Sequence, residues 1–366
     1  MKGFKDRYVN LDALLARIAE SIQLDDTRKG RMESAYNAID SILSNDEIFW
    51  KKIKYEIYPQ GSVKIGTTIK PQDNDEFDLD IVVHIYDDWK KYSASQIYSH
   101  LKRAISNNDK YKNKIELKNR CIRVNYSGDF HMDILPGIQE FSYDKDTIKI
   151  PDRELHGWTS SNPRGYAEWF LEKADSVKIL LLEKAFAQED LNLEEFAKKQ
   201  PLKRAVQLLK MYRNEYFKKN QEYSTSSIIL TTLAAQFYEG ESSIYDSIEK
   251  IINQINKQIQ TGQILRVLNP KNSRENFAEK WQNNSTLYEK FCEFNNHMML
   301  NWIELQNDNQ YENERILKSL FSERNYNFGL EAHNNYLARL EKIRENDFSG
   351  LRELAEPNSS FQKPYF

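Results

Sequence analysis

Apolar residues in the first half of the chain recur with two different spacings. From about residue 10 to residue 48 they return every three or four positions, which predicts helices. Further on they alternate with polar residues in four short stretches, "KIKYEIYP", "DLDIVVHI", "CIRVNY" and "DFHMDILPGI", which predicts strands. A helix is expected between the second and third stretches, from Ser95 to about Ser106. We therefore predict a sheet with helices packed against it.

The second half shows only the helical spacing, and no strand pattern of comparable strength occurs there. The stretches that fit helices are "DSVKILLLEKAFAQ", "LKRAVQLLKMYRNEYF", "SSIILTTLAAQFY", "SIYDSIEKIINQINKQI" and the segment from about Asn284 to Gln306. The polar stretch "HGWTSSNPRGY" separates the two halves. We expect one lobe over residues 1–170, a helical lobe over residues 171–350, and a flexible tail over residues 351–366.

Length and composition narrow the class of protein. A chain of 366 residues with 40% hydrophobic content can form two packed lobes. Its 52 basic and 55 acidic residues give a formal net charge of −3, so the chain as a whole is not drawn to nucleic acid. The two cysteines, Cys121 and Cys292, form neither a disulfide framework nor a metal-binding pair. With no signal peptide and no membrane-length apolar run, the sequence predicts a soluble cytoplasmic protein.

Two carboxylates stand on one face of the strand predicted for "DLDIVVHI". Side chains alternate along a strand, so Asp78 and Asp80 point to the same side, opposite Leu79 and Ile81. Two like charges repel, and burial without a counter-charge would be costly. A Mg²⁺ or Mn²⁺ ion would resolve the repulsion, because these ions prefer oxygen ligands. An exposed strand edge whose aspartates face water explains the same pattern equally well.

A third carboxylate favours the metal interpretation. In "DFHMDILPGI", Asp133 shares a face with His131 and Leu135, while Met132 and Ile134 take the other face. If this strand lies beside "DLDIVV", Asp133 completes a three-carboxylate cluster, and three acids can hold two metal ions about 3.5–4 Å apart. His131 is expected to neighbour the site rather than to bind the ions.

The turn before the acidic strand adds a candidate phosphate site. Gln60, Gly61 and Ser62 follow a predicted strand, and Gly61 permits a close backbone approach. The Ser62 hydroxyl and nearby backbone N–H groups could hold the oxygens of a triphosphate, and Lys64 could add charge. A Gly-Ser pair alone is usually only a turn, so the signal lies in the ordered set of turn, paired acids and distal acid.

This ordered set resembles the signature of the polymerase-β-like nucleotidyltransferase superfamily. Five stretches, two of which contain this set, occur in an order similar to that of the bacterial cGAS/DncV-like nucleotidyltransferases (CD-NTases), the signal-making enzymes of CBASS anti-phage systems. The resemblance runs from about residue 10 to about residue 305. Its stretches are "GSVKIGTTIKP…EFDLDIVV", "FHMDILPGI", "LKRAVQLLKMYRN", "SSIILTTLAA" and "NPKNSRENFAEKW".

The resemblance implies an α+β fold, with a polymerase-β-like palm and a helical lobe similar to that of oligoadenylate synthetase. It implies condensation of nucleoside triphosphates, ATP among them, into a cyclic di- or trinucleotide second messenger, without a template and with release of pyrophosphate. Asp78 and Asp80 would bind two Mg²⁺ or Mn²⁺ ions, and Asp133 would complete the second site and help to activate the attacking hydroxyl. The six histidines are scattered and lack a cysteine cluster, so DNA activation is not expected.

The resemblance also suggests phosphate ligands in the helical lobe. A lysine on the polar face of "LKRAVQLLKMYRN" would reach the donor triphosphate; Lys210 is the candidate and Lys203 the alternative. An ordinary solvated helix face explains the same pattern. Ser226, or Ser224 as the alternative, would bind the same phosphates, although either serine could simply cap the next helix.

Other functions share parts of this pattern. An RNA-tailing or protein-nucleotidylating transferase would keep the fold and change the acceptor, and a nucleotide-sensing or scaffolding module would lack turnover. The three intact acids argue against the last of these.

Arg123 faces the same way as Cys121 and Asn125, toward the acceptor side of the cluster. The aromatic C-terminal "FQKPYF" could be bound by a CBASS regulatory protein, and a frayed terminus is the simpler interpretation.

Overall fold

A mixed sheet forms the centre of the first half of the molecule. The computed structural model describes residues 2–71, 77–126, 130–176, 199–306 and 309–355. The sheet runs in the order β1-β2-β5-β4-β3, and β6 pairs with β5 and β7. β2 and β5 are parallel, whereas the other pairs are antiparallel. The strands are β1 (Tyr55–Pro59), β2 (Phe77–Ile85), β3 (Ile115–Leu117), β4 (Ile122–Tyr126), β5 (Phe130–Phe141), β6 (Asp144–Asp152) and β7 (Gly157–Ser161).

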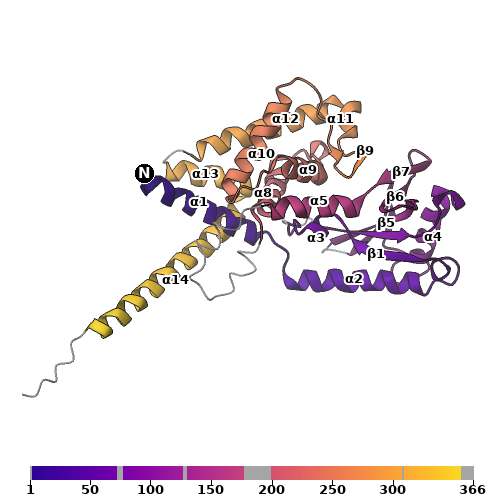
Figure 1. Ribbon diagram of the computed structural model, residues 1–366, viewed down its shortest axis with the longest axis horizontal. Helices are drawn as coiled ribbons and strands as arrows, with labels where there is room; N and C mark the ends of the chain where they lie inside the picture. The colour runs from indigo at the N-terminus through magenta and orange to yellow at the C-terminus, as the bar shows by residue number, and fades with distance from the viewer. Residues whose placement is uncertain (1, 72–76, 127–129, 177–198, 307–308, 356–366) are drawn as a thin grey trace, which may run out of the picture.

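The four strands predicted from the sequence are confirmed, and three more, β3, β6 and β7, join them. β3 is only three residues long, β6 carries charged residues on both faces, and β7 lies in the predicted polar boundary, so none of the three shows a strand pattern. The apolar face of β2, with Leu79, Ile81 and Val83, packs in one core with α2 (Asp26–Ser44) and α4 (Ala94–Ser106). The opposite face carries Asp78 and Asp80, which line one cavity together with residues of α5 (Pro163–Asp175) and of the helical lobe. Figure 1 shows α5 and α2 on opposite sides of the sheet.

The helical lobe has its own apolar core. It includes α1 (Lys2–Ser21), so the N-terminal helix packs with helices from the second half of the chain. Gly329 lets α14 pack closely on α1, and Figure 1 shows α14 extending away from the body. The other helices are α8 (Pro201–Tyr216), α9 (Ser227–Phe237), α10 (Ile244–Ile259), α11 (Glu279–Asn283), α12 (Ser285–Glu304), α13 (Gln310–Phe321) and α14 (Glu323–Ala355).

The second half contains a short hairpin that was not expected, and its last helix extends into the expected tail. A short hairpin of β8 (Leu268–Asn269) and β9 (Asn272–Asn276) lies there although no strand was expected, because its polar, Asn-rich strands show no apolar alternation. Residues 351–355 of the expected tail are helical, as the end of α14, and residues 356–366 lie outside the described part. The helix predicted for "DSVKILLLEKAFAQ" also lies outside it from residue 177 onward.

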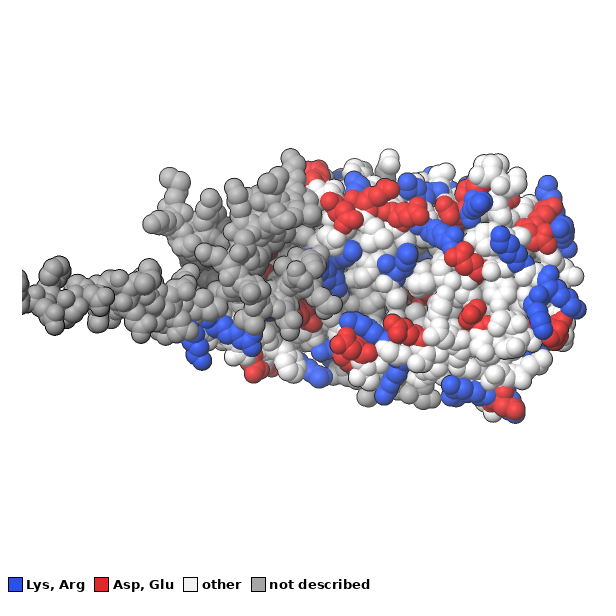
Figure 2. All heavy atoms as spheres, turned by 60° about the horizontal axis from the view of Figure 1, so that its bottom comes forward, with Lys and Arg blue, Asp and Glu red and all other residues white. Residues whose placement is uncertain are grey.

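The charged side chains are mixed over the face shown in Figure 2. On the described residues in this view, basic and acidic groups lie side by side, without an extended area of one sign. None of the described helices combines the length and apolar content needed to cross a bilayer.

Candidate active site

A cavity of about 690 Å³ lies between the sheet and the helical lobe. Side chains from both halves of the chain line it, and they include most of the candidates found in the sequence. From the sheet side come Gln60, Gly61, Ser62, Asp78, Asp80 and His131, and from the helical side come Lys210, Arg213, Asn214, Ser224 and Ser227. The structure therefore brings the predicted turn, acidic strand and helix face together.

The three predicted carboxylates stand on neighbouring strands. Asp80 of β2 lies directly opposite Asp133 of β5 in the parallel pair, which confirms that these two strands are adjacent. Asp78 lies opposite His131, one step along the same face. Crowding and burial raise the pKa of Asp80 to about 7; burial is the largest cause, followed by repulsion from Asp78 and Asp133. Such a cluster favours a bound cation.

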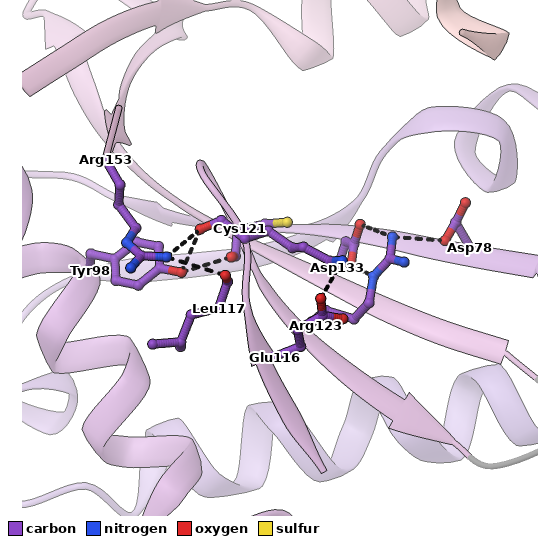
Figure 3. Close-up of polar contacts among 9 residues, drawn as sticks. Asp78, Tyr98, Glu116, Leu117, Cys121, Arg123, Asp133 and Arg153 are labelled. Atoms are coloured by element: carbon purple, nitrogen blue, oxygen red, sulfur yellow. Dashed lines mark hydrogen bonds and ion pairs between the residues drawn. The ribbon is translucent and has the colours of Figure 1, made fainter. Parts of the chain in front are cut away.

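An arginine from the next strand neutralises part of this cluster. Arg123 of β4 lies opposite Asp133. Its Nε donates to Oδ1 of Asp133 at 2.7 Å and its Nη2 to Oδ2 at 2.8 Å. The same Nη2 reaches Oδ1 of Asp78 at 3.2 Å, so the guanidinium joins the two carboxylates, as Figure 3 shows. These hydrogen bonds raise the pKa of Arg123 and keep its charge fixed.

The geometry of these carboxylates supports the metal-binding prediction only in part. The donors suit a divalent cation, because they are carboxylate oxygens with excess negative charge. Within the described residues, however, no three His, Cys, Asp or Glu side chains are arranged to hold a metal ion. Both oxygens of Asp133 are engaged by Arg123. The three-ligand set of Asp78, Asp80 and Asp133 is thus not assembled in this structure.

The Gly-Ser turn is fixed against the acidic strand. The N–H of Gln60 donates to the carbonyl oxygen of Asp80 at 2.8 Å. Gly61 has a φ of 59°, and a Cβ placed there would lie 2.5 Å from Oδ2 of Asp80. Only glycine fits here without strain, and the close approach is to the Asp80 carboxylate; the approach of a phosphate to Gly61 stays a prediction. Ser62 lines the cavity beside it, whereas Lys64 is exposed and does not.

The polar face of α8 is buried, so the solvated-face interpretation is wrong for its central residues. Nζ of Lys210 donates to the carbonyl oxygen and Oγ1 of Thr67, both at 3.1 Å. Gln207 donates to the carbonyl oxygen of Thr68 at 2.8 Å. Burial, and then the charge of Arg213, lower the pKa of Lys210 to about 7. Lys203, the alternative candidate, does not line the cavity.

The serines before α9 are arranged differently from the expectation. Ser226 occupies the N-cap position, but its side chain is exposed, makes no capping hydrogen bond and does not line the cavity. Its neighbours Ser224 and Ser227 do line it. The phosphate-binding role of Ser226 stays a prediction, and the geometry favours these two neighbours for it.

Sequence reasoning missed two charged residues of the cavity. Arg213 lines it and donates to Oγ of Ser227. It lies three residues after Lys210, a helical spacing that could have indicated it. Glu275 of β9 accepts hydrogen bonds from Ser161 at 2.9 Å and Asn269 at 2.7 Å. No local signal distinguished Glu275, because the hairpin that carries it was not predicted.

The sheet, its aligned carboxylates, the Gly-Ser turn and the facing helical lobe have the polymerase-β-like fold, and the relatives below show that the chain is a nucleotidyltransferase. Residues 10–174 match the model of the Second Messenger Oligonucleotide or Dinucleotide Synthetase domain. A c-di-GMP synthase of Roseivirga ehrenbergii is 42% identical over 94% of this chain and 91% of its own length. The cyclic dinucleotide synthase CdnG of Bradyrhizobium diazoefficiens is 24% identical over 93% of this chain and 87% of its own.

Solved structures agree on the fold. The CD-NTase CdnG of Bradyrhizobium diazoefficiens, solved with GTP, gives a TM-score of 0.72 at 20% identity, over 88% of this chain and 98% of its own. The E. coli CdnC:HORMA-deltaN complex gives 0.59 at 12% identity, over 85% and 96%. The chain belongs to the cGAS/DncV-like nucleotidyltransferases of CBASS anti-phage systems, as the sequence resemblance indicated. It is a cyclic-oligonucleotide synthase, and its family uses divalent metal ions.

Proposed function

We propose that this enzyme joins two molecules of GTP into cyclic di-GMP. The observation that carries the choice of base and ring is the 42% identity, over almost the whole chain, to a relative that is a c-di-GMP synthase. The chemistry is supported by one cavity that holds the Gly-Ser turn, Asp78 and Asp80 on one wall and Lys210 and Arg213 on the other. We place the enzyme in the cytoplasm, where nucleoside triphosphates are abundant.

The proposed reaction consists of two phosphoryl transfers in the same cavity. The turn at Gly61 and Ser62 holds the triphosphate of the donor, and Lys210 and Arg213 offset its charge. A ribose hydroxyl of the second GTP attacks the α-phosphate of the donor; a P–O bond forms to that hydroxyl and the bond to pyrophosphate breaks. A second attack closes the ring and releases a second pyrophosphate. Catalysis rests on positioning and charge neutralisation.

Asp78, Asp80 and Asp133 are proposed to hold two Mg²⁺ or Mn²⁺ ions. Bound there, such ions would supply Lewis-acid stabilisation of the charge on the transferring phosphoryl group. Asp133 is proposed to help activate the attacking hydroxyl once it is released from Arg123. Asp80, half-buried and close against Gly61, holds the turn and the acidic strand in register.

Product analysis tests this proposal directly. The full chain is incubated with ATP, GTP, CTP and UTP and with Mg²⁺ or Mn²⁺, without added acceptor, and the products are identified by mass spectrometry. We expect cyclic di-GMP from the wild type and a loss of at least about a hundredfold in Asp78→Asn and Asp80→Asn. Asp109→Asn is the matched control, because that aspartate is exposed and pairs only with Lys112 within the described residues.

The same experiment separates the alternative function. An RNA-tailing or protein-nucleotidylating transferase would give no cyclic product without an acceptor. The formal net charge of −3 favours the cyclic synthase over an RNA enzyme, which should carry a basic channel. Substantial cyclic product from Asp78→Asn would remove the assignment of the acidic strand.

A regulatory partner is also proposed for the C-terminus. One structural relative was solved as a complex with a HORMA protein. We propose that a CBASS regulatory protein binds the end of this chain, after α14. Deletion of residues 357–366 with unchanged defence in cells would contradict it.

A further inference from the structure

Arg123 lies where the proposed metal ions would have to bind. Its Nε and Nη2 take both oxygens of Asp133, at 2.7 and 2.8 Å, and Nη2 also takes Oδ1 of Asp78 at 3.2 Å. Two of the three carboxylates assigned to metal binding therefore already have a cation (Figure 3). The third, Asp80, stands beside Asp133 on the neighbouring strand.

The register of the sheet fixes the contact between Arg123 and Asp133. β5 lies between β2 and β4, and Asp80, Asp133 and Arg123 are directly opposite one another across the three strands. Side chains that face each other in this way share one side of the sheet. The guanidinium therefore has Asp133 as its nearest cross-strand neighbour, and its two parallel N–H groups match a carboxylate.

We propose that Arg123 is an internal competitor for the metal ions. Its guanidinium holds Asp133 and Asp78 in the metal-free protein and must leave them before the three carboxylates can share a cation. This inference rests on the proposed function, which assigns these carboxylates to metal binding. It goes beyond that function by making metal binding conditional on the position of one arginine.

The competition follows from position and charge. Nη2 of Arg123 bridges Asp133 and Asp78, so it occupies the place of a cation shared by these two carboxylates, and its fixed positive charge repels a divalent ion nearby. Among the described residues, no three His, Cys, Asp or Glu side chains are placed to share a metal ion. The apparent metal affinity is then the intrinsic affinity multiplied by the fraction of molecules in which Arg123 has left Asp133.

The test measures Mn²⁺ binding to the nucleotide-free, full-length protein by electron paramagnetic resonance of the free ion. Arg123→Met removes the charge and keeps the length of the side chain, and we expect its Kd to fall by about tenfold to a hundredfold, the equivalent of a charge-assisted hydrogen bond. Arg123→Lys should lie between, because an ammonium lacks the bidentate fork. The control is Arg120→Met, since Arg120 bridges Asp152 and Glu279 away from the cluster, and its Kd should equal that of the wild type.

Two results would overturn the inference: Arg123→Met binding Mn²⁺ no more tightly than the wild type, or Arg123→Lys binding as weakly as the wild type. A measurement on the wild type serves if Arg123→Met does not fold. The Nε–H signal of Arg123, identified by its loss in Arg123→Lys, should shift as Mg²⁺ saturates the site; an unchanged signal at saturation refutes the exchange. If the wild type makes cyclic product and Arg123→Met binds Mn²⁺ with unchanged affinity, the proposed function stands. Only the inference that Arg123 competes with the metal ions is then refuted.

Discussion

Asp80 connects three separate parts of the cavity at the scale of single residues. Its carbonyl oxygen accepts the N–H of Gln60, its carboxylate lies against Gly61, and its Cα is opposite that of Asp133. A substitution in the turn therefore acts on the acidic strand as well. Because the carboxylate of Asp80 fills the space in which a Cβ at Gly61 would lie, the two positions are coupled sterically.

Gly61→Ala should disturb both the backbone and Asp80. A positive φ costs a non-glycine residue about 1–2 kcal/mol, and the new methyl group would displace the Asp80 carboxylate. We expect reduced stability and a loss of about a hundredfold in synthesis, the scale of a catalytic group misplaced by about 1 Å. Unfolding in urea and product formation from GTP measure the two effects.

Gly262→Ala provides the matched control. Gly262 has a φ of 74°, but a Cβ there meets nothing within 4 Å. The Gly262→Ala variant should lose a similar amount of stability, because its backbone is strained, and should form product at the wild-type rate. Equal activity in the two variants would mean that the close approach to Asp80 is not required.

At the scale of elements, α8 serves both the core and the cavity. Leu208, Leu209 and Tyr212 are buried in the helical core, while Lys210 meets the segment that follows α3 (Gly61–Ile65). This segment begins at Gly66, which has a φ of 72° and ends the short helix. One helix thus positions a cation relative to the Gly-Ser turn.

Lys210→Met should separate the chemical role of this helix from its structural role. Methionine keeps the length of the side chain and removes the charge, but it leaves the buried carbonyl oxygen of Thr67 without this donor, so the fold should be retained with a lower melting temperature. We expect kcat/KM for GTP to fall by about tenfold to a hundredfold, because a charged contact to phosphate is lost. Lys203→Met is the comparison, since Lys203 is on the same face but outside the cavity lining. A larger loss in Lys203→Met would transfer the assignment to that residue.

At the scale of the whole molecule, contacts between distant parts of the chain join its two ends and tie the helical lobe to the sheet. α1 and α14, from opposite ends of the chain, pack on one another. The β8–β9 hairpin reaches back to the sheet, where Arg274 forms two hydrogen bonds with Glu140 of β5, at 2.7 and 2.8 Å. The helical lobe is therefore tied to the sheet through the hairpin as well as through the main interface.

Gly329→Ala should weaken the packing of the two end helices. A Cβ at Gly329 would lie 2.6 Å from Cγ1 and 2.9 Å from the backbone nitrogen of Ile18, so α14 would have to move away from α1. Overpacking of this kind costs about 1–3 kcal/mol. Urea unfolding at neutral pH measures the loss.

Gly30→Ala is the control for a glycine within a helix. Gly30 lies in α2 with nothing within 4 Å of its added Cβ, so this variant should be more stable by about 0.5–1 kcal/mol. A Gly329→Ala protein as stable as the wild type would contradict close packing between α1 and α14.

The sequence by itself determined the local part of this protein. Helical and alternating spacing are properties of neighbouring residues, so they predicted α2, α4, β2 and β5 and placed Asp78 and Asp80 on one face. The ordered motifs also sufficed to indicate the family, which the relatives confirm.

Only the tertiary structure decided the remaining features, because they depend on residues far apart in the chain. Parallel pairing of β2 and β5 brought Asp133 beside Asp80, and the pairing of β4 turned Arg123 onto the same cluster. Burial converted the polar face of α8 into a cavity wall, and side-chain contacts held a hairpin that has no pattern of its own. Strand neighbours and burial are set by long-range packing, and local spacing carries no information about either.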